Sequence, residues 1–268
     1  MAEQQLAAVN LAKRPKLCEI LIRKRRTHCH CISTDKPPKR PDPAIYSQLQ
    51  RLSQGLGTSW ESPDVQTNYW SPWRFMDSIV VYVRNESTES SAVNTLVQAK
   101  WAAFGIGTPF NPLGDQVINL GIAPDQQTLL FPVNDSLRAL GNDVSIQINI
   151  SHPHDKDVAN NTGFQAIHGV TTSESGKSPG MTFAVVNASA STETITLVVL
   201  ANDIAATVTP AVRTYAPNEQ ITATLSAVVP ASITPPAGGY ILKDATVVGY
   251  NSSGKILGGV TLLVRVDS

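Results

Sequence analysis

The sequence predicts an all-β protein made of two tandem β-sandwiches behind a basic N-terminal arm. Of its 268 residues, 42% are hydrophobic and only 16% are charged, a balance typical of sandwiches whose solvent faces carry Thr, Ser and Asn. From about residue 60, apolar residues tend to recur at every second position, and short apolar runs are separated by Gly, Pro and Asn. No helical period lies between these runs, which favours a sandwich or barrel over an α/β fold.

The predicted strands of the first sandwich follow from this alternation. Residues 77–84 (DSIVVYVR) predict a core strand, and residues 94–101 predict a second one in which only Leu96 breaks the pattern. Residues 144–150 (VSIQINI) alternate without a fault and give the clearest half-buried strand of the chain.

A second set of strands follows the turn-rich stretch 171–180 and predicts another sandwich. Its members alternate or run apolar between turn residues. They are residues 181–186, 194–200, 221–227, 240–250 and 257–266.

Three segments are therefore predicted along the chain: an arm at 1–55, one sandwich at 56–172 and another at 173–268. The arm ends in a proline-rich stretch at 36–43 (KPPKRPDP), which is typical of a linker, and in a short predicted helix. The helix is predicted from the helical spacing of Ile45, Leu49 and Leu52, and Gly55 is expected to end it.

A weak internal repeat supports two related units. The motif V-x-N-x-S occurs at 83–87 and again at 185–189, 102 residues later. In both copies a predicted strand ends at the asparagine (Asn85 or Asn187), where the side chain is expected to hold a turn by bonding to nearby backbone.

The residues also resemble a known family of bacterial domains. The run IVVYVRNESTESSAVNTLVQAKW looks like the early strands of CARDB-type (cell-adhesion-related) immunoglobulin-like domains, and VSIQINISHPHDKDVANNTGFQAI looks like their last two strands and the polar loop between them. This resemblance covers about residues 60–172. Residues 178–268 are similar to immunoglobulin-like modules appended to bacterial glycosidases and surface proteins. Together these resemblances imply two immunoglobulin-like sandwiches that act as spacers, adhesion units or assembly units.

The arm carries a cluster of cysteine and histidine residues. Thiolates and imidazoles suit Zn²⁺, and a tetrahedral set would combine Cys18, Cys29 and Cys31 with one histidine such as His28. The paired C-x₂-C spacing of zinc knuckles is missing, so inter-chain disulfides and free thiols stay open as alternatives. No other cofactor is indicated.

Charge divides the chain into two parts. Residues 1–55 hold 11 Lys/Arg and 4 Asp/Glu, whereas residues 56–268 hold 10 Lys/Arg and 17 Asp/Glu. The arm is therefore expected either to contact an acidic surface or a neighbouring copy, or to be solvated. The residues predicted to bind a partner are Arg23, Lys24, Arg25 and Arg26 by charge, and Ile45, Leu49 and Leu52 by apolar docking.

Aromatic residues gather before the first strand. Trp60, Trp70 and Trp73 form a candidate platform for sugar rings or a protein surface, with packing into the sandwich as the alternative. A second polar group, from His152 to Asn161, offers oxygen ligands for Ca²⁺, with a structural loop as the alternative.

The sequence predicts a non-enzymatic protein. It has no G-x-S-x-G, H-E-x-x-H, phosphate-binding loop or dinucleotide motif. We expect a structural, assembly or adhesion protein whose partner is a second copy or another surface protein, with a carbohydrate- or ligand-binding accessory module as the alternative. Arg23–Arg26 lack interleaved aromatics, so nucleic acid is the weakest reading. No membrane span or classical signal peptide is indicated, and we expect cytoplasmic synthesis with a non-Sec route to a surface or particle left open.

Overall fold

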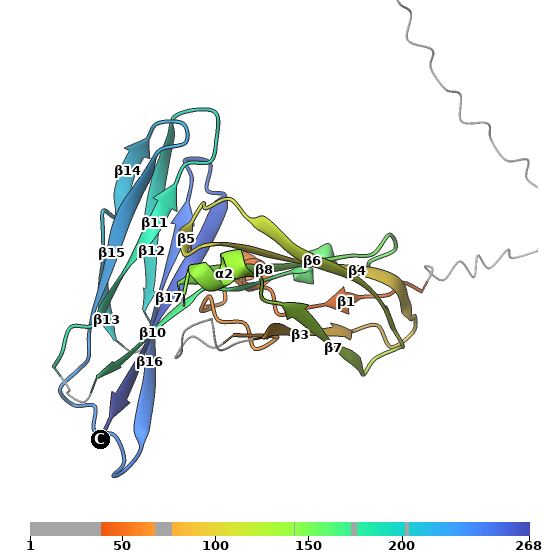
Figure 1. Cartoon of the computed structure of the whole chain (residues 1–268), viewed down its shortest axis with the longest axis horizontal. Helices are drawn as coiled ribbons and strands as arrows, with labels where there is room; N and C mark the ends of the chain where they lie inside the picture. The colour runs from red at the N-terminus through yellow and green to blue at the C-terminus, as the bar shows by residue number, and fades with distance from the viewer. Residues whose placement is uncertain (1–38, 68–76, 142, 173–175, 202–203) are drawn as a thin grey trace, which may run out of the picture. The chain divides into compact units, whose positions relative to one another are not determined.

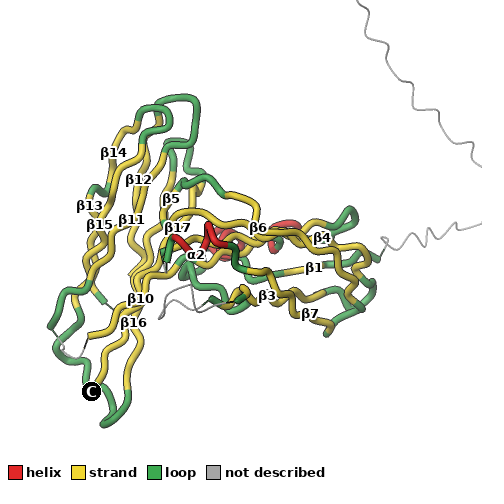
Figure 2. The backbone as a smooth tube through the Cα atoms, viewed as in Figure 1, coloured by secondary structure: helices red, strands yellow, loops and turns green. Residues whose placement is uncertain are grey.

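The structure, a computed structural model, describes residues 39–67, 77–141, 143–172, 176–201 and 204–268. The protein is all-β, as predicted, and the helices in these ranges are short (Figures 1 and 2). In the same ranges, four sheets enclose two separate hydrophobic cores. None of the helices in these ranges is long and apolar enough to cross a membrane.

The first sandwich has a sheet in which β3 pairs on one side with β7 and on the other with the short strands β1 and β2. Its second sheet has the order β6-β4-β8-β9. The bounds are β1 Pro43–Ala44, β2 Val65–Gln66, β3 Ser78–Asn85, β4 Ala92–Ala103, β6 Asn111–Leu120, β7 Asp125–Pro132, β8 Val144–Ser151 and β9 Thr162–Gln165.

The core of the first sandwich comes from alternate residues of these strands. Ile79, Val81 and Val83 of β3 face Ile146 and Ile148 of β8, and all five are fully buried. The period-two pattern that predicted β3, β4 and β8 is confirmed, because each strand has one face in this core.

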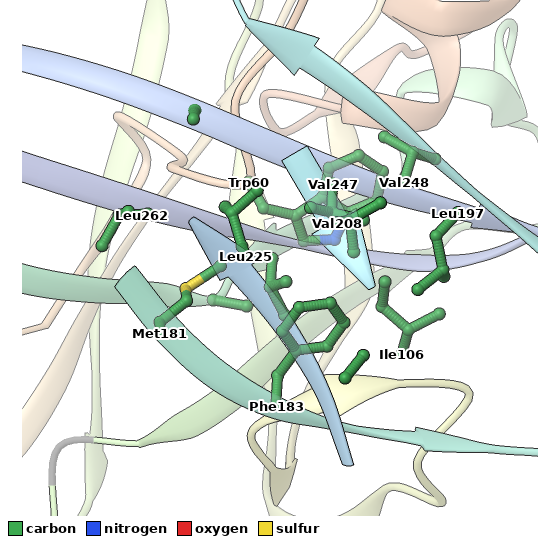
Figure 3. Packing of buried hydrophobic residues seen from close by; sticks show 14 of the residues in the cluster. Trp60, Ile106, Met181, Phe183, Leu197, Val208, Leu225, Val247, Val248 and Leu262 are labelled. Atoms are coloured by element: carbon green, nitrogen blue, oxygen red, sulfur yellow. The ribbon is translucent and has the colours of Figure 1, made fainter. Parts of the chain in front are cut away.

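The second sandwich has the sheets β13-β15-β11-β5 and β10-β17-β16-β12-β14. Figure 3 shows its core, where Met181, Phe183 and Leu225 of one sheet meet Leu197, Val247 and Leu262 of the other. The bounds are β5 Gly105–Ile106, β10 Ile167–Thr172, β11 Gly180–Val186, β12 Glu193–Ala201, β13 Ala205–Thr209, β14 Val212–Tyr215, β15 Gln220–Val228, β16 Tyr240–Tyr250 and β17 Ile256–Asp267.

Two strands of the second sandwich come from earlier in the chain. Strand β5 pairs in parallel with β11, and β10 pairs in parallel with β17 along six residues. Fully buried Ile106 of β5 lies above Gly249, where an added Cβ would stand 2.4 Å from Ile106. The division at 172/173 stays a prediction, but the hydrogen-bonded sheets of the second sandwich include residues on both sides of it.

The three short helices among the described residues lie in connections. The predicted helix is confirmed as α1 (Gln48–Ser53), where the Ser47 side chain caps the start by accepting from the Gln50 N–H. Helix α2 (Asp135–Ala139) is capped by Asn134, and the 3₁₀ helix η2 (Val158–Asn160) is capped by Asp157.

Residues 39–55 pack as part of the body, although the sequence places them in the arm. Strand β1 pairs with the end of β3, Ile45 is 1% exposed, and the compact unit that contains both sandwiches begins at Lys39. The physical reason is that this segment covers an edge of the first sandwich.

Both copies of the V-x-N-x-S repeat form the predicted asparagine turn. Asn85 accepts from the Ser87 N–H at 3.1 Å and donates to two carbonyls, while Asn187 accepts from the Ser189 N–H at 3.0 Å and donates to the carbonyls of Ser191 and Ala216. Both asparagines are at most 3% exposed. Each therefore satisfies several backbone groups at once where a strand ends.

Candidate interaction surface

One lateral edge of the first sandwich is sealed by a glutamine side chain. Strand β9 ends its sheet, and the fully buried Gln48 of α1 lies beside it. The Gln48 Nε2 donates to the Phe164 carbonyl at 2.7 Å, and the Phe164 N–H donates to Oε1 at 3.0 Å. A primary amide thus replaces the neighbouring strand that β9 lacks, because it offers one donor and one acceptor side by side.

Backbone and side chains of the same segment continue this seal. The Ser62 N–H donates to Gln165 Oε1 at 2.7 Å, and the Ala166 N–H donates to the Trp60 carbonyl at 2.9 Å. Residues 45–62 therefore run along the β9 edge and hydrogen-bond to the backbone of Phe164 and Ala166 and to the Gln165 side chain.

An ion pair fixes the sealing segment to β3. Asp64 Oδ2 accepts from the Tyr46 N–H and from Arg84 Nη1, both at 2.6 Å. Burial alone would lower the pKa of the Arg84 guanidinium, but the Asp64 and Glu86 carboxylates outweigh it and raise that pKa. Arg84 therefore stays charged and keeps the segment attached.

The opposite lateral edge is open. Strand β6 ends its sheet and β7 pairs with β3 on one side only, so no described strand pairs with the outer side of either. Two glutamines tie the strands together: Gln116 Nε2 donates to the Leu130 carbonyl at 2.8 Å and Gln127 Nε2 donates to the Asn119 carbonyl at 2.6 Å. These bridges occupy one carbonyl on each strand.

Apolar side chains are exposed along this edge. Val117 is 64% exposed, Ile122 53% and Leu130 56%, whereas their neighbours Ile118 and Leu129 are buried. We call β6, β7 and these three exposed residues the open edge. An unpaired strand edge with exposed apolar side chains is suited to pairing with another chain.

A cavity of about 490 Å³ forms a separate feature. Leu49, Phe110, Phe164 and Leu257 give it apolar walls, and Glu193 and Lys255 contribute charged groups. The rings of Phe110 and Phe164 lie 6.3 Å apart. Its size and apolar lining are those of small-ligand pockets in general.

The apolar residues predicted to dock a partner lie elsewhere. Ile45 is in the first core at 1% exposure, while Leu49 and Leu52 are partly buried against the second core. The prediction is wrong for Ile45, because its side chain is buried in the protein's own core and cannot contact a partner. Helical spacing identifies an apolar stripe but does not say what covers it.

The predicted role of Trp60 in a ligand platform is also wrong. It is 1% exposed, and Figure 3 shows it among the core side chains. An added Cβ on Gly259 would stand 2.5 Å from its ring, so the indole packs directly against this glycine of β17. Its backbone N–H donates to Thr261 Oγ1 at 2.7 Å. The side chain packs into the body and cannot stack on a sugar.

Other predicted sites lie outside the described residues. These are Trp70 and Trp73, the basic group Arg23, Lys24, Arg25 and Arg26, and the candidate zinc ligands Cys18, His28, Cys29 and Cys31. Within the described part of the chain, no three His, Cys, Asp or Glu residues gather where they would hold a metal ion.

The polar loop at 152–161 is ordered by its own side chains. Asp155 is 4% exposed and accepts from Asn161 Nδ2 at 2.6 Å and from the Asp157 N–H at 3.0 Å. Burial raises the pKa of the Asp155 carboxyl, the two hydrogen bonds oppose the rise, and the nearby Asp42 charge adds to it. The loop is therefore a buried polar cluster that includes Asp42 at the start of the body.

Sequence reasoning missed the open edge because β6 and β7 were not predicted. Their signal is weak but present: Ile118 and Leu120 alternate with Val117 and Asn119, and Leu129 and Phe131 alternate with Leu130 and Pro132. Exposed apolar residues on the outer face hide the alternation.

Comparison with solved structures finds distant similarity to several β proteins. PapD-like domain 7 of human CEP192 is 12% identical, with 37% of this chain and 80% of that chain covered at a TM-score of 0.28. The CupB6 tip adhesin from Pseudomonas aeruginosa is 8% identical, with 84% and 97% covered at 0.25, and the BSP domain of a biofilm associated protein is 10% identical, with 85% and 58% covered at 0.21. Likeness at these scores carries no argument about function, and the CARDB-type resemblance stays a prediction. No protein-family model matches the chain, and no curated protein matches its sequence.

Proposed function

We propose that the chain is a non-enzymatic structural or adhesion protein whose immunoglobulin-like sandwiches make protein–protein contacts, with a second copy as the first partner. The absence of catalytic motifs in the sequence supports a role without chemistry or cofactor.

The asymmetry between the two lateral edges carries this proposal. The β9 edge is closed by Gln48 and residues 45–62, whereas the β6 and β7 edge keeps outward backbone groups and three exposed apolar side chains. Both strands are long, with ten and eight residues. A second chain that adds a strand here gains main-chain hydrogen bonds and covers Val117 and Leu130.

Charge gives a second route to assembly. The arm is basic and the rest of the chain acidic in equal measure. An arm that carries Arg23–Arg26 is therefore attracted to the body of a neighbouring copy, and this attraction weakens as salt screens it.

Light scattering of the full chain over a range of protein concentrations tests the proposal. We expect the mass to rise with concentration for the natural chain and to stay monomeric for the double variant Val117→Lys/Leu130→Lys. The matched control is Val212→Lys/Val228→Lys, which adds the same two charges at exposed positions of β14 and β15. Replacement of Arg23–Arg26 by Glu measures how much the arm's positive charge contributes to assembly. This contribution should decrease at high salt.

A monomeric natural chain at every concentration would contradict self-assembly. Equal assembly of the double variant and the control would show that the open edge is not the contact.

The cavity favours a second candidate, a ligand-binding accessory module. Because Trp60 is buried, the walls at Phe110 and Phe164 take the place of the predicted platform. A glycan array, with Phe110→Ala and Trp70→Ala as variants, tests it: binding lost only in Phe110→Ala assigns the ligand to the cavity, and binding lost only in Trp70→Ala assigns it to the tryptophan.

A further inference from the structure

Four buried polar side chains meet where the chain enters the first sandwich. Asp42 precedes β1, and Asp155, Asn160 and Asn161 come from the connection between β8 and β9. Their exposures are 7%, 4%, 4% and 6%, so all four are more than nine-tenths buried.

The two asparagine amides point into this cluster. Asn160 Nδ2 donates to Asp42 Oδ1 at 3.0 Å, and Asn161 Nδ2 donates to Asp155 Oδ2 at 2.6 Å. Because the asparagines are consecutive, they bring the two carboxylates together, and Asp42 is close enough to raise the pKa of Asp155.

Both amide oxygens lack a partner. Among the described residues, three buried side-chain polar atoms have no hydrogen bond, and two of them are Asn160 Oδ1 and Asn161 Oδ1. A buried oxygen without a donor is unfavourable, since it has lost its water and gained nothing in return. Two in adjacent residues of one cluster indicate a partner that the described residues do not supply, such as a cation or a water.

The carboxylates also lack an ion-pair partner, although the charge of a protonated His152 would lower the pKa of Asp155. Neither Asp42 nor Asp155 forms an ion pair with a described residue. The nearby Arg40 guanidinium donates to the backbone carbonyls of His154 and Asp155 instead. The cluster therefore combines two negative charges with two unused neutral oxygens.

We propose that Asp42, Asp155, Asn160 and Asn161 form a calcium-binding site that fastens the start of the body to the β8–β9 connection. Carboxylate and amide oxygens are the ligands that Ca²⁺ takes, and its flexible coordination suits a set drawn from two segments. Mg²⁺ fits less well because it demands near-octahedral geometry and keeps its water.

Binding would stabilise the junction from which the arm departs. The Lys156 N–H donates to the Pro41 carbonyl at 2.9 Å and the Glu86 N–H to the Asp42 carbonyl at 2.8 Å, so backbone hydrogen bonds at and beside Asp42 already join three segments. An ion at this point would stabilise the segment around Asp42, near the start of the compact unit, and would not contact the open edge.

The experiment uses the full chain, stripped with EDTA and titrated with CaCl₂ by isothermal calorimetry and thermal unfolding. With an affinity near the millimolar value of extracellular calcium modules, 10 mM Ca²⁺ should raise the Tm by about 3 to 6 °C. We expect one Ca²⁺ per chain and a smaller effect of Mg²⁺.

The test variants are Asp155→Asn and Asp42→Asn, and the matched control is Asp115→Asn, an exposed aspartate on β6. Loss of the calcium shift in the first two and its retention in the control support the site. No heat and no Tm shift in the natural chain would overturn it and leave a buried water as the partner of the amides. Calcium binding retained in folded Asp155→Asn would also overturn it, by placing the ion elsewhere.

Discussion

Replacing Gln48 by alanine should unseal the protected edge of the first sandwich. The change removes both partners of Phe164: its N–H loses Oε1 at 3.0 Å, and its carbonyl loses Nε2 at 2.7 Å. Each buried backbone group left unpaired costs about 1–3 kcal/mol. With Gln48 fully buried, the Gln48→Ala variant should lose about 2–5 kcal/mol of unfolding free energy.

Urea unfolding at equilibrium measures this loss, with Gln116→Ala as the matched control. Gln116 also donates to a backbone carbonyl, but that bond is exposed and water can replace it, so we expect a change within about 0.5 kcal/mol. At an m-value of about 2–3 kcal/mol per molar, Gln48→Ala should lower the urea midpoint by about 1–2 M. Equal and small losses in both variants would refute the idea that one edge is sealed and the other is not.

Three further changes test separate parts of the fold. Asn187→Ala removes the hydrogen bonds that the buried Nδ2 donates to the Ser191, Tyr215 and Ala216 carbonyls, and it should cost about 2–4 kcal/mol in urea unfolding; a loss below about 0.5 kcal/mol would show that the asparagine turn is not structural. Gly259→Ala puts a Cβ 2.5 Å from the Trp60 ring, and it should cost about 1–3 kcal/mol and shift the tryptophan fluorescence, whereas Gly114→Ala, whose Cβ meets Phe131 at an ordinary 3.6 Å, should be nearly neutral. Trp60→Ala should lose about 3–5 kcal/mol, which circular-dichroism melting would detect, and a neutral result would contradict its burial.

The fold class was predictable because a strand with one buried face shows apolar residues at every second position of its sequence. Residues 144–150 alternate without a fault, and β8 has isoleucines of the core at the same positions. This alternation is weaker in the edge strands β6 and β7, which were not predicted. Val117 and Leu130 are apolar but face solvent, so they interrupt the pattern.

Pairing between distant strands could not be predicted at all. Nothing local tells that Gly105–Ile106 pairs with β11 or that β10 pairs with β17, because register depends on the partner strand. The same limit explains the incorrect surface role for Trp60 and Ile45, whose neighbours lie more than 100 residues away in the chain. The asparagine turns were predictable, since their hydrogen bonds to Ser87 and Ser189 are local.

Backbone amide hydrogen exchange along β6 and β9 of the full chain, at low and high protein concentration, tests the open edge most directly. The account predicts that Phe164 in β9 is protected at both concentrations, and that the outward amides of β6 exchange rapidly when dilute and slowly once the chains associate. Rapid exchange in β6 at both concentrations, while light scattering shows assembly, would contradict the account and place the contact on another surface.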